Sequence, residues 1–162
     1  MKTLRKIQDK IILRSNISQL IDALNKKNKK IIFSNGCFDL VHRGHVEYLA
    51  KAADLADVFI LGLNTDASVQ RLKGTNRPLQ DEYARAILMS GFSFIDYVVL
   101  FDEDTPYELI KEIQPDVLVK GDDYKIEDVV GYDIVKNKGG KVQTIELTKG
   151  YSTSLIVDKI KS

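Results

Sequence analysis

Short apolar runs recur along the chain, separated by polar segments. They cover residues 31–33, 58–63, 97–101, 117–119 and 142–145. Most are nearly continuous in apolar residues and are followed directly by polar residues or glycine, which is typical of strands buried on both faces of a parallel sheet. The pattern therefore predicts five strands.

The segments between these runs carry apolar residues at helical spacing. Val46, Leu49, Ala50 and Ala53 fall at i, i+3, i+4 and i+7, so a helix is expected to begin near Gly44. Further helices are expected at 67–72, 80–91, 105–113 and 154–160.

Residues 1–30 form a helical lead-in to this alternation. Leu20, Ile21 and Leu24 make one apolar stripe, Ser18 could cap their helix, and the lysine-rich segment 25–30 ends it. Strands that alternate with helices, without repeats or a dividing linker, indicate a single α/β domain over residues 1–162. We expect a Rossmann-like three-layer sandwich with a mostly parallel five-stranded sheet.

Polar side chains gather just after the predicted strands. They are Asn35, Asp39, His42 and His45 after the first strand, Asn64 and Asp66 after the second, Lys120, Gly121, Asp122 and Asp123 after the fourth, and residues 148–154 after the last. Ligands of open parallel sheets bind beyond the carboxyl ends of the strands, so these residues are expected to converge on one edge.

Composition narrows the classes of function. Lysine plus arginine total 24 against 23 acidic residues, a formal charge of +1 that gives no support to a general nucleic-acid-binding surface. The sequence shows no secretory signal and no run of about 18 apolar residues, so a cytoplasmic protein without a membrane partner is expected. The single cysteine, Cys37, excludes an internal disulfide framework and a multi-cysteine zinc site.

The segment from Ile31 to Leu49 holds the most informative pattern. A strand leads through a Ser-Asn-Gly turn into the helix that begins near Gly44, and both histidines of the chain, His42 and His45, lie at that helix start. Free backbone N–H groups and the helix dipole favour an anion there. Gly44 has no side chain, so a phosphate could approach the backbone between two imidazole donors. The alternative interpretation is a pair of solvent-exposed histidines.

These motifs resemble those of a known family. Phe38-Asp39, His42-x-Gly44-His45 and the distal Gly-Tyr-Ser-Thr-Ser of residues 150–154 resemble the cytidylyltransferase-like nucleotidyltransferases. Within that superfamily the chain is most similar to the heptose 1-phosphate adenylyltransferases, through segments 34–40, 63–69, 71–74, 77–78, 101–106 and 115–121. Because no kinase-like segment precedes these motifs, a stand-alone transferase domain is expected.

The resemblance implies a reaction and its partners. ATP and D-glycero-D-manno-heptose 1-phosphate would give ADP-heptose and pyrophosphate, as part of heptose supply for a surface glycan of the lipopolysaccharide type. It also implies Mg²⁺ as cofactor and a homodimer. A sugar phosphate dianion needs no general base, so the protein's tasks would be positioning and charge stabilisation.

The catalytic roles implied by the resemblance fall to His42, His45 and Lys73. The imidazoles would hold the triphosphate as hydrogen-bond donors, and Lys73 would neutralise repulsion between the two substrates. An exposed surface lysine is the alternative for Lys73. Asp39 could orient a histidine or help to hold Mg²⁺, although a helix cap is also compatible with its position.

Nucleotide-binding residues are expected at Gly36, Cys37, Phe38, Asp39, Gly44, Lys120, Gly121, Asp122, Ser152, Thr153 and Ser154. Lys120, Gly121 and Asp122 would lie near the base and ribose, and the distal hydroxyls near the β- and γ-phosphates. The distal serine could instead be an ordinary N-cap. Cys37 is expected to be a packing residue without a covalent role.

Substrate-binding residues are expected at Asn64, Asp66 and Arg85. Asn64 and Asp66 could accept hydrogen bonds from sugar hydroxyls or form a structural Asx-turn. Arg85 could contact a phosphate through its guanidinium or pair with Asp81 at i,i+4.

Three alternative functions stay open. Two are transferases of the same superfamily, a glycerol-3-phosphate cytidylyltransferase and an FMN adenylyltransferase. Leu147 stands where the cytidylyltransferase usually carries an arginine, and Gly121-Asp122-Asp123-Tyr124 replaces the more usual Gly-Gly-Asp-Tyr of the adenylyl enzymes. The third is a non-catalytic nucleotide-binding regulatory module.

Overall fold

The computed structural model describes residues 1–162. Its six strands form a single parallel sheet. The strands follow the order β1-β4-β3-β2-β5-β6. Their bounds are β1 Ile11–Ile12, β2 Ile31–Gly36, β3 Val58–Asn64, β4 Tyr97–Phe101, β5 Val117–Gly121 and β6 Lys141–Ile145. Every pairing is parallel, which confirms the α/β class.

The predicted number of five strands was wrong by one. The additional strand, β1, lies in the lead-in that was expected to be helical, and it pairs with β4 through Ile11 and Ile12. Two residues are too few to produce a recognisable apolar run. The strand forms because it covers the free edge of β4.

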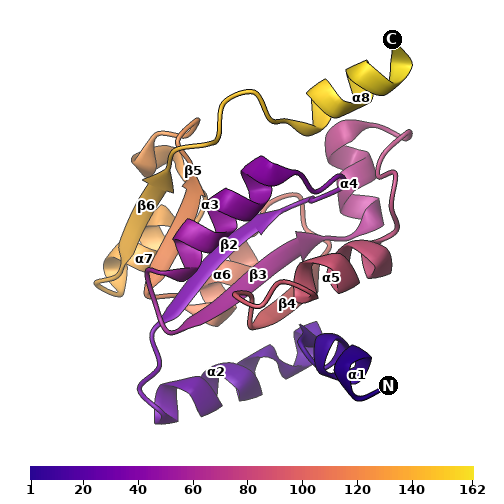
Figure 1. Cartoon of the computed structure of the whole chain (residues 1–162). Coiled ribbons are helices and arrows are strands. Elements are labelled where there is room, and N and C mark those ends of the chain that lie inside the picture. The colour runs from indigo at the N-terminus through magenta and orange to yellow at the C-terminus, as the bar shows by residue number, and fades with distance from the viewer.

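Eight α-helices accompany the sheet (Figure 1). They are α1 Lys2–Gln8, α2 Ile17–Lys26, α3 Arg43–Ala53, α4 Asp66–Lys73, α5 Glu82–Ser90, α6 Tyr107–Ile113, α7 Tyr132–Asn137 and α8 Thr153–Lys161. The predicted capping role of Ser18 was wrong, because α2 has Asn16 at its N-cap and no side-chain cap bond. None of these helices has the length and apolar character that crossing a membrane requires.

Two hydrophobic clusters sandwich the sheet. Side chains alternate along β2, so that Ile31 and Phe33 join one cluster and Ile32 joins the other. The first cluster includes buried residues of α2, α6 and α7, and the second includes buried residues of α3 and α5. This three-layer arrangement explains why most strand sequences are apolar on both faces.

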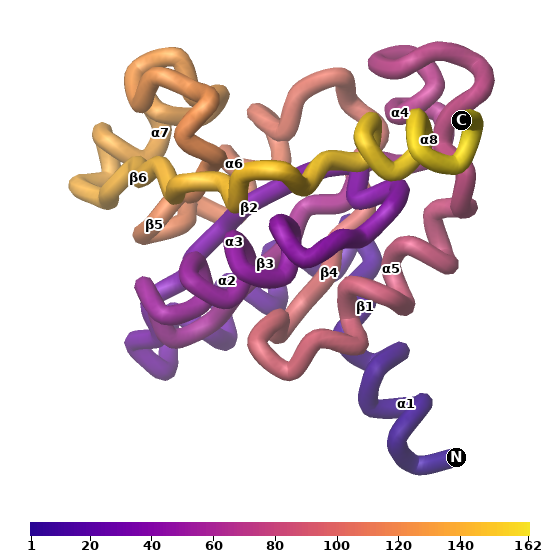
Figure 2. The backbone as a smooth tube through the Cα atoms, turned by 45° about the horizontal axis from the view of Figure 1, so that its top comes forward, coloured from indigo at the N-terminus to yellow at the C-terminus, as the bar shows by residue number.

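The chain order places a crevice at one end of the sheet. From the central β2 the chain adds β3 and β4 on one side, and β5 and β6 lie on the other. The direction in which strands are added to the sheet therefore reverses at β2, and such a reversal leaves a crevice beyond the carboxyl ends of the strands. After β6 the chain crosses that end of the molecule on the side of α3 before α8 begins (Figures 1 and 2). The segment that leads into α8 therefore borders the crevice.

Candidate functional site

A cavity of about 430 Å³ occupies the carboxyl end of the sheet. Ten of the predicted binding and catalytic residues line it: Gly36, Cys37, Phe38, Asp39, His45, Asn64, Lys73, Lys120, Gly121 and Thr153. Asn35, also expected at this edge, lines it as well. They come from the segments that follow β2, β3, β5 and β6, so the predicted convergence of these segments is observed. Among the predicted residues, His42, Gly44, Asp66, Arg85, Asp122, Ser152 and Ser154 do not line it.

The two histidines stack on each other at the start of α3. Their ring centroids are 3.8 Å apart at an interplanar angle of 21°, and His42 is the N-cap residue of the helix. The ring of Phe38 packs edge-on against His45 with centroids 5.1 Å apart. Nδ1 of both rings is buried and has no hydrogen-bond partner. The rings are therefore held by packing and not by a hydrogen bond at Nδ1.

Burial and neighbouring charges keep the imidazoles neutral. Desolvation, together with the charges of His42 and Lys73, lowers the pKa of His45 to about 4. Desolvation also lowers the pKa of His42. At neutral pH the pair consequently offers hydrogen bonds without a full positive charge.

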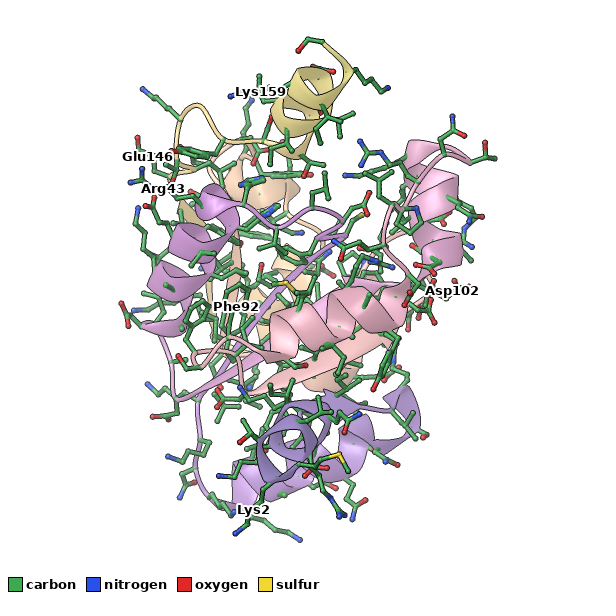
Figure 3. The ribbon with its side chains drawn as sticks, turned by 45° about the vertical axis from the view of Figure 1, so that its right-hand side comes forward. Lys2, Arg43, Phe92, Asp102, Glu146 and Lys159 are labelled. Carbon is green, nitrogen blue, oxygen red and sulfur yellow. The ribbon has the colours of Figure 1, made fainter.

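Gly44 makes room for an imidazole. A Cβ at this position would lie 3.1 Å from Cε1 and Nδ1 of the His42 ring. The space that was expected to admit a phosphate between the imidazoles is thus occupied by His42 itself. Arg43 lies on the same first turn, at the end of α3 that faces the segment leading into α8 (Figure 3), and its guanidinium stands 5.4 Å from the centre of the Tyr151 ring.

Two lysines bring positive charge to the cavity. Lys73 is the last residue of α4, and its charge lowers the pKa of both His45 and Cys37. Lys120, near the end of β5, donates from Nζ to the backbone carbonyl of Asn35 at 3.3 Å. Desolvation lowers the pKa of Lys120 to about 8.

Asp39 has partners other than those predicted. It is only 3% exposed. Oδ2 accepts a hydrogen bond from Nη1 of Arg77 at 2.7 Å, and Oδ1 accepts from the backbone N–H groups of Leu79 and Gln80. Although burial raises the pKa of Asp39, these hydrogen bonds more than offset it and hold the pKa below its usual value. The carboxylate therefore ties the 77–80 segment to the loop after β2, and it orients neither histidine.

Arg85 is a structural residue, which corrects both interpretations offered for it. Its side chain is completely buried, and Nη2 pairs with Oδ1 of Asp66 at 2.7 Å. Nη1 donates to the carbonyl oxygens of Cys37 and Asn64, and Nε donates to that of Gln80. It reaches neither the cavity nor Asp81. Asp66 is correspondingly engaged with Arg85, away from the cavity.

Some of the remaining predicted residues line the cavity, and the others lie outside it. Asn64 lines the cavity while its Nδ2 donates to Oγ of Ser68 at 3.0 Å. Asp122 turns outward to accept from the N–H of Leu147 at 3.1 Å. At α8, Ser152 is the N-cap and accepts from the N–H of Leu155, Ser154 is exposed, and Thr153 alone faces the cavity.

Gly121 and Cys37 form close-packed walls of the cavity. A Cβ on Gly121 would lie 2.7 Å from Oδ1 of Asp123 and 2.9 Å from the Leu147 side chain, so both side chains pack closely over the glycine. Burial raises the pKa of the Cys37 thiol, despite opposing charges from Lys73, Arg85 and Lys120. The thiol is therefore poorly suited to be a nucleophile, in agreement with a packing role.

Sequence reasoning missed several residues at the site. They are Arg77, which holds Asp39, and the cavity residues Tyr48, Leu72, Asp104, Thr105, Pro106, Tyr124, Val129, Val130 and Leu147. Most lie in connections whose path has no periodic signal. The one available signal was their position directly after the predicted strands.

The residues at the site could accommodate Mg²⁺ only if a bound ligand supplied most of its coordination. No group of three His, Cys, Asp or Glu side chains in residues 1–162 could hold a metal, and both oxygens of the Asp39 carboxylate are occupied. Mg²⁺ commonly binds through substrate phosphates and water with one or two protein carboxylates. A phosphate-bearing ligand would therefore supply most of its coordination.

Comparison with known proteins places the chain in a family. Residues 33–159 match the family model described as Cytidylyltransferase-like. The chain is 55% identical over 143 residues to the bifunctional protein HldE of Campylobacter jejuni subsp. doylei, and 52% identical over 151 residues to that of Syntrophotalea carbinolica. These matches cover 88% and 93% of this chain but 30% and 31% of the relatives, so the chain spans about a third of their length.

Solved structures agree with this assignment. A lipopolysaccharide core biosynthesis protein from Thermoplasma volcanium superposes with a TM-score of 0.61 at 27% identity, covering 76% of this chain and 99% of the other. A pantoate-beta-alanine ligase from Francisella tularensis shares the fold, with a TM-score of 0.59 at 18% identity over 93% of this chain and 77% of the other. With its paired imidazoles beside the cavity and the family match over most of its length, the chain belongs to the cytidylyltransferase-like family of nucleotidyltransferases.

Proposed function

We propose that the protein transfers AMP from ATP to a heptose 1-phosphate, giving ADP-heptose and pyrophosphate for a heptose-containing surface glycan. The resemblance to heptose 1-phosphate adenylyltransferases supports this, as do the relatives named HldE and the lipopolysaccharide core biosynthesis protein. One observation carries the proposal: a neutral, stacked imidazole pair at a helix start places His45 in the lining of a cavity that also holds two lysines.

The reaction is an in-line displacement at the α-phosphorus. An oxygen of the sugar phosphate forms the new P–O bond, while the bond to the bridging oxygen breaks and pyrophosphate leaves with that electron pair. A phosphate dianion carries no proton that must be removed, so no general base is required. The low pKa of His45, about 4, agrees with a donor role at neutral pH.

Charge stabilisation is the main task of the side chains. The histidines would donate N–H groups to triphosphate oxygens, and the first turn of α3 adds backbone N–H groups that have no side-chain cap. Lys73 would neutralise charge that develops on the leaving group. Mg²⁺, bound through the triphosphate, would add charge neutralisation when present.

We also propose a cytoplasmic homodimer. ATP as a substrate is compatible with the cytoplasm. Helix α8 has no buried residue, and its Leu155 and Ile160 are 53% and 77% exposed, as expected of a surface that a second copy covers. Light scattering coupled to size exclusion tests this, with a mass of twice 18.3 kDa expected.

A substrate panel tests the proposed reaction. Pyrophosphate release is measured with ATP, CTP and GTP, each combined with heptose 1-phosphate, glycerol 3-phosphate or FMN. We expect release with ATP and heptose 1-phosphate. Release only with CTP and glycerol 3-phosphate, or only with ATP and FMN, would identify another transferase of the family. ATP binding without release from any pair would indicate a regulatory module.

A further inference from the structure

We propose that Glu47 is a positioning residue for the nucleotide, because it holds the 146–152 segment against α3. That segment leads to Thr153, which lines the cavity, and α3 begins at the imidazole pair. Glu47 does not line the cavity, so it acts through the segment that it holds. The inference rests on the proposed function, since it requires a triphosphate that contacts both the imidazoles and the start of α8.

Few other contacts hold the 146–152 segment. Apart from the bond from the N–H of Ile156 to the carbonyl of Ser152 at the start of α8, no backbone–backbone hydrogen bond joins it to another part of the chain. Helix α8, which follows it, has no buried residue, so burial of that helix does not fix the segment either. Its position therefore depends on a small number of contacts that involve side chains.

Glu47 uses both carboxylate oxygens in these contacts. Oε2 accepts a hydrogen bond from Oγ1 of Thr148 at 2.5 Å, and Oε1 accepts one from Nε of Arg43 at 2.6 Å. The Arg43 guanidinium in turn lies 5.4 Å from the centre of the Tyr151 ring and donates from Nη1 to the Tyr151 hydroxyl at 3.4 Å. One carboxylate therefore holds Thr148 directly and orients the guanidinium that contacts Tyr151.

The other hydrogen bonds lie at the two ends of the segment. The N–H of Leu147 donates to Oδ1 of Asp122 at 3.1 Å, and Oγ1 of Thr153 donates to the carbonyl of Leu40 at 3.3 Å. Residues 148–151 are bonded to the rest of the protein through Glu47 and Arg43 alone. Removal of the Glu47 carboxylate should therefore release the middle of the segment.

This arrangement connects two parts of the proposed triphosphate site. The start of α3 provides the imidazoles, and the start of α8 provides N–H groups of a first helical turn, which have no intrahelical partner. Glu47 lies one turn after Arg43 on α3, so its carboxylate joins the second part to the helix that carries the first. Loss of Glu47 should weaken nucleotide binding and leave the hydrophobic clusters intact.

Steady-state kinetics of Glu47→Ala test this role. We expect the KM for ATP to rise about 5- to 10-fold and the KM for the sugar phosphate to change less than about 2-fold. The side chains of Glu47 and Arg43 are 35% and 61% exposed, so the Tm should stay within about 2 °C of wild type. Glu146→Ala, at an exposed position of the same segment (Figure 3), is the matched control and should behave as wild type.

A double-mutant cycle distinguishes this contact from a general surface effect. Thr148→Val removes the hydroxyl that bonds to Glu47 and should also raise the KM for ATP. Because both substitutions break the same contact, the double variant should resemble Glu47→Ala. Thr148→Ser keeps the hydroxyl and should lie closer to wild type than Thr148→Val. A KM in the double variant that equals the product of the two single effects would contradict the contact.

Limited proteolysis with trypsin reports on the segment without any reaction. Lys149 is exposed and lies in the middle of the segment. Cleavage after Lys149, followed by mass spectrometry, should be at least about 5-fold faster in Glu47→Ala than in wild type, because cleavage requires local release of the segment. Saturating ATP with Mg²⁺ should slow this cleavage in the wild type. Equal rates in the two proteins, or no protection by ATP, would overturn the proposal.

The outcomes separate the two proposals. If Glu47→Ala leaves the KM for ATP unchanged, or raises that for the sugar phosphate as much, the role of Glu47 is overturned while the proposed reaction stands. If the wild type uses another acceptor, the proposed reaction fails and the KM for ATP is compared with that acceptor. If no acceptor supports pyrophosphate release, the calorimetric Kd of ATP for wild type and Glu47→Ala replaces the KM in this comparison. If ATP does not bind, both proposals fail.

Discussion

Residue pairing, rather than residue type, determines which charges a ligand meets in this cavity. Asp39 and Arg77 neutralise each other, as do Asp66 and Arg85, and these pairs connect loops. What the cavity offers to an anion is consequently a small set of groups: the imidazoles, Lys73 and Lys120. Each can be tested by a single substitution.

His45→Ala removes one preorganised donor and should lower kcat by about 10²- to 10³-fold. The fold should survive, because the ring is held by packing against His42 and Phe38 and has no Nδ1 partner. Pyrophosphate release and circular dichroism of the same preparation check both statements. Kinetics like those of the wild type in a folded variant would refute the donor role.

His45 should also make stability depend on pH. Its pKa is about 4 in the folded protein and near 6.5 when unfolded, so between these values the unfolded chain binds more protons. Stability should therefore fall as pH decreases from about 6.5 to about 4, with a slope that approaches about 1.4 kcal/mol per pH unit. Urea unfolding across this range should show the slope in wild type and a reduced slope in His45→Asn. Equal slopes would contradict the burial of an unprotonated ring.

Elements meet at the site through buried polar side chains. Arg85 on α5 joins the loop after β2, the end of β3 and the first residue of α4. Since those segments also carry Cys37, Asn64 and Lys73, the arginine fixes the shape of the cavity without touching a ligand.

Arg85→Met should destabilise the protein by about 3 kcal/mol, because three carbonyl oxygens and Asp66 lose their donor. Arg71→Met on α4 is the matched control. Arg71 is paired with Asp102 and Asp104, but its side chain is 45% exposed, so its loss should cost less than about 1 kcal/mol. Chemical denaturation of the two variants gives the comparison. A smaller loss for Arg85 than for Arg71 would contradict the structural role.

The same elements show what the sequence could and could not predict. Four of the longer strands, β2 to β5, were predictable because burial on both faces makes a strand largely apolar. β6, which has exposed positions, was predictable from Val142 and Ile145. Two elements were not predicted because their apolar patterns are too short to recognise. β1 has two residues, and α7 buries only Ile134 and Val135. Among site residues, position after a strand identified Lys120 and His45, and the family resemblance identified Lys73. Asp66, expected from its position after a strand, and Arg85, expected on a helix at the same edge, were misplaced, because sequence position does not reveal which side chains turn inward to pair.

On the scale of the whole molecule, the cavity is bordered by segments from most of the chain, including the loop after β2, α4, β5 and α8. A ligand that contacts all of these segments stabilises the folded protein as a whole. Binding to the folded state alone stabilises it by about 2.7 kcal/mol at a hundredfold excess over Kd.

ATP with Mg²⁺ at such an excess should therefore raise the Tm by roughly 5–10 °C. Removing Mg²⁺ with a chelator should reduce the shift, because the triphosphate would then bring uncompensated charge to Lys73 and the neutral imidazoles. Differential scanning fluorimetry measures both effects, and His45→Ala serves as the comparison. An identical Tm with and without nucleotide would contradict the proposed binding site.

A crystal structure with a non-hydrolysable ATP analogue, Mg²⁺ and heptose 1-phosphate tests the proposed site most directly. We predict triphosphate oxygens at hydrogen-bond distance, about 2.7–3.2 Å, from His45, with the sugar phosphate in the same cavity on the far side of the α-phosphorus. A nucleotide bound away from the imidazole pair, or a sugar phosphate outside the cavity, would contradict it.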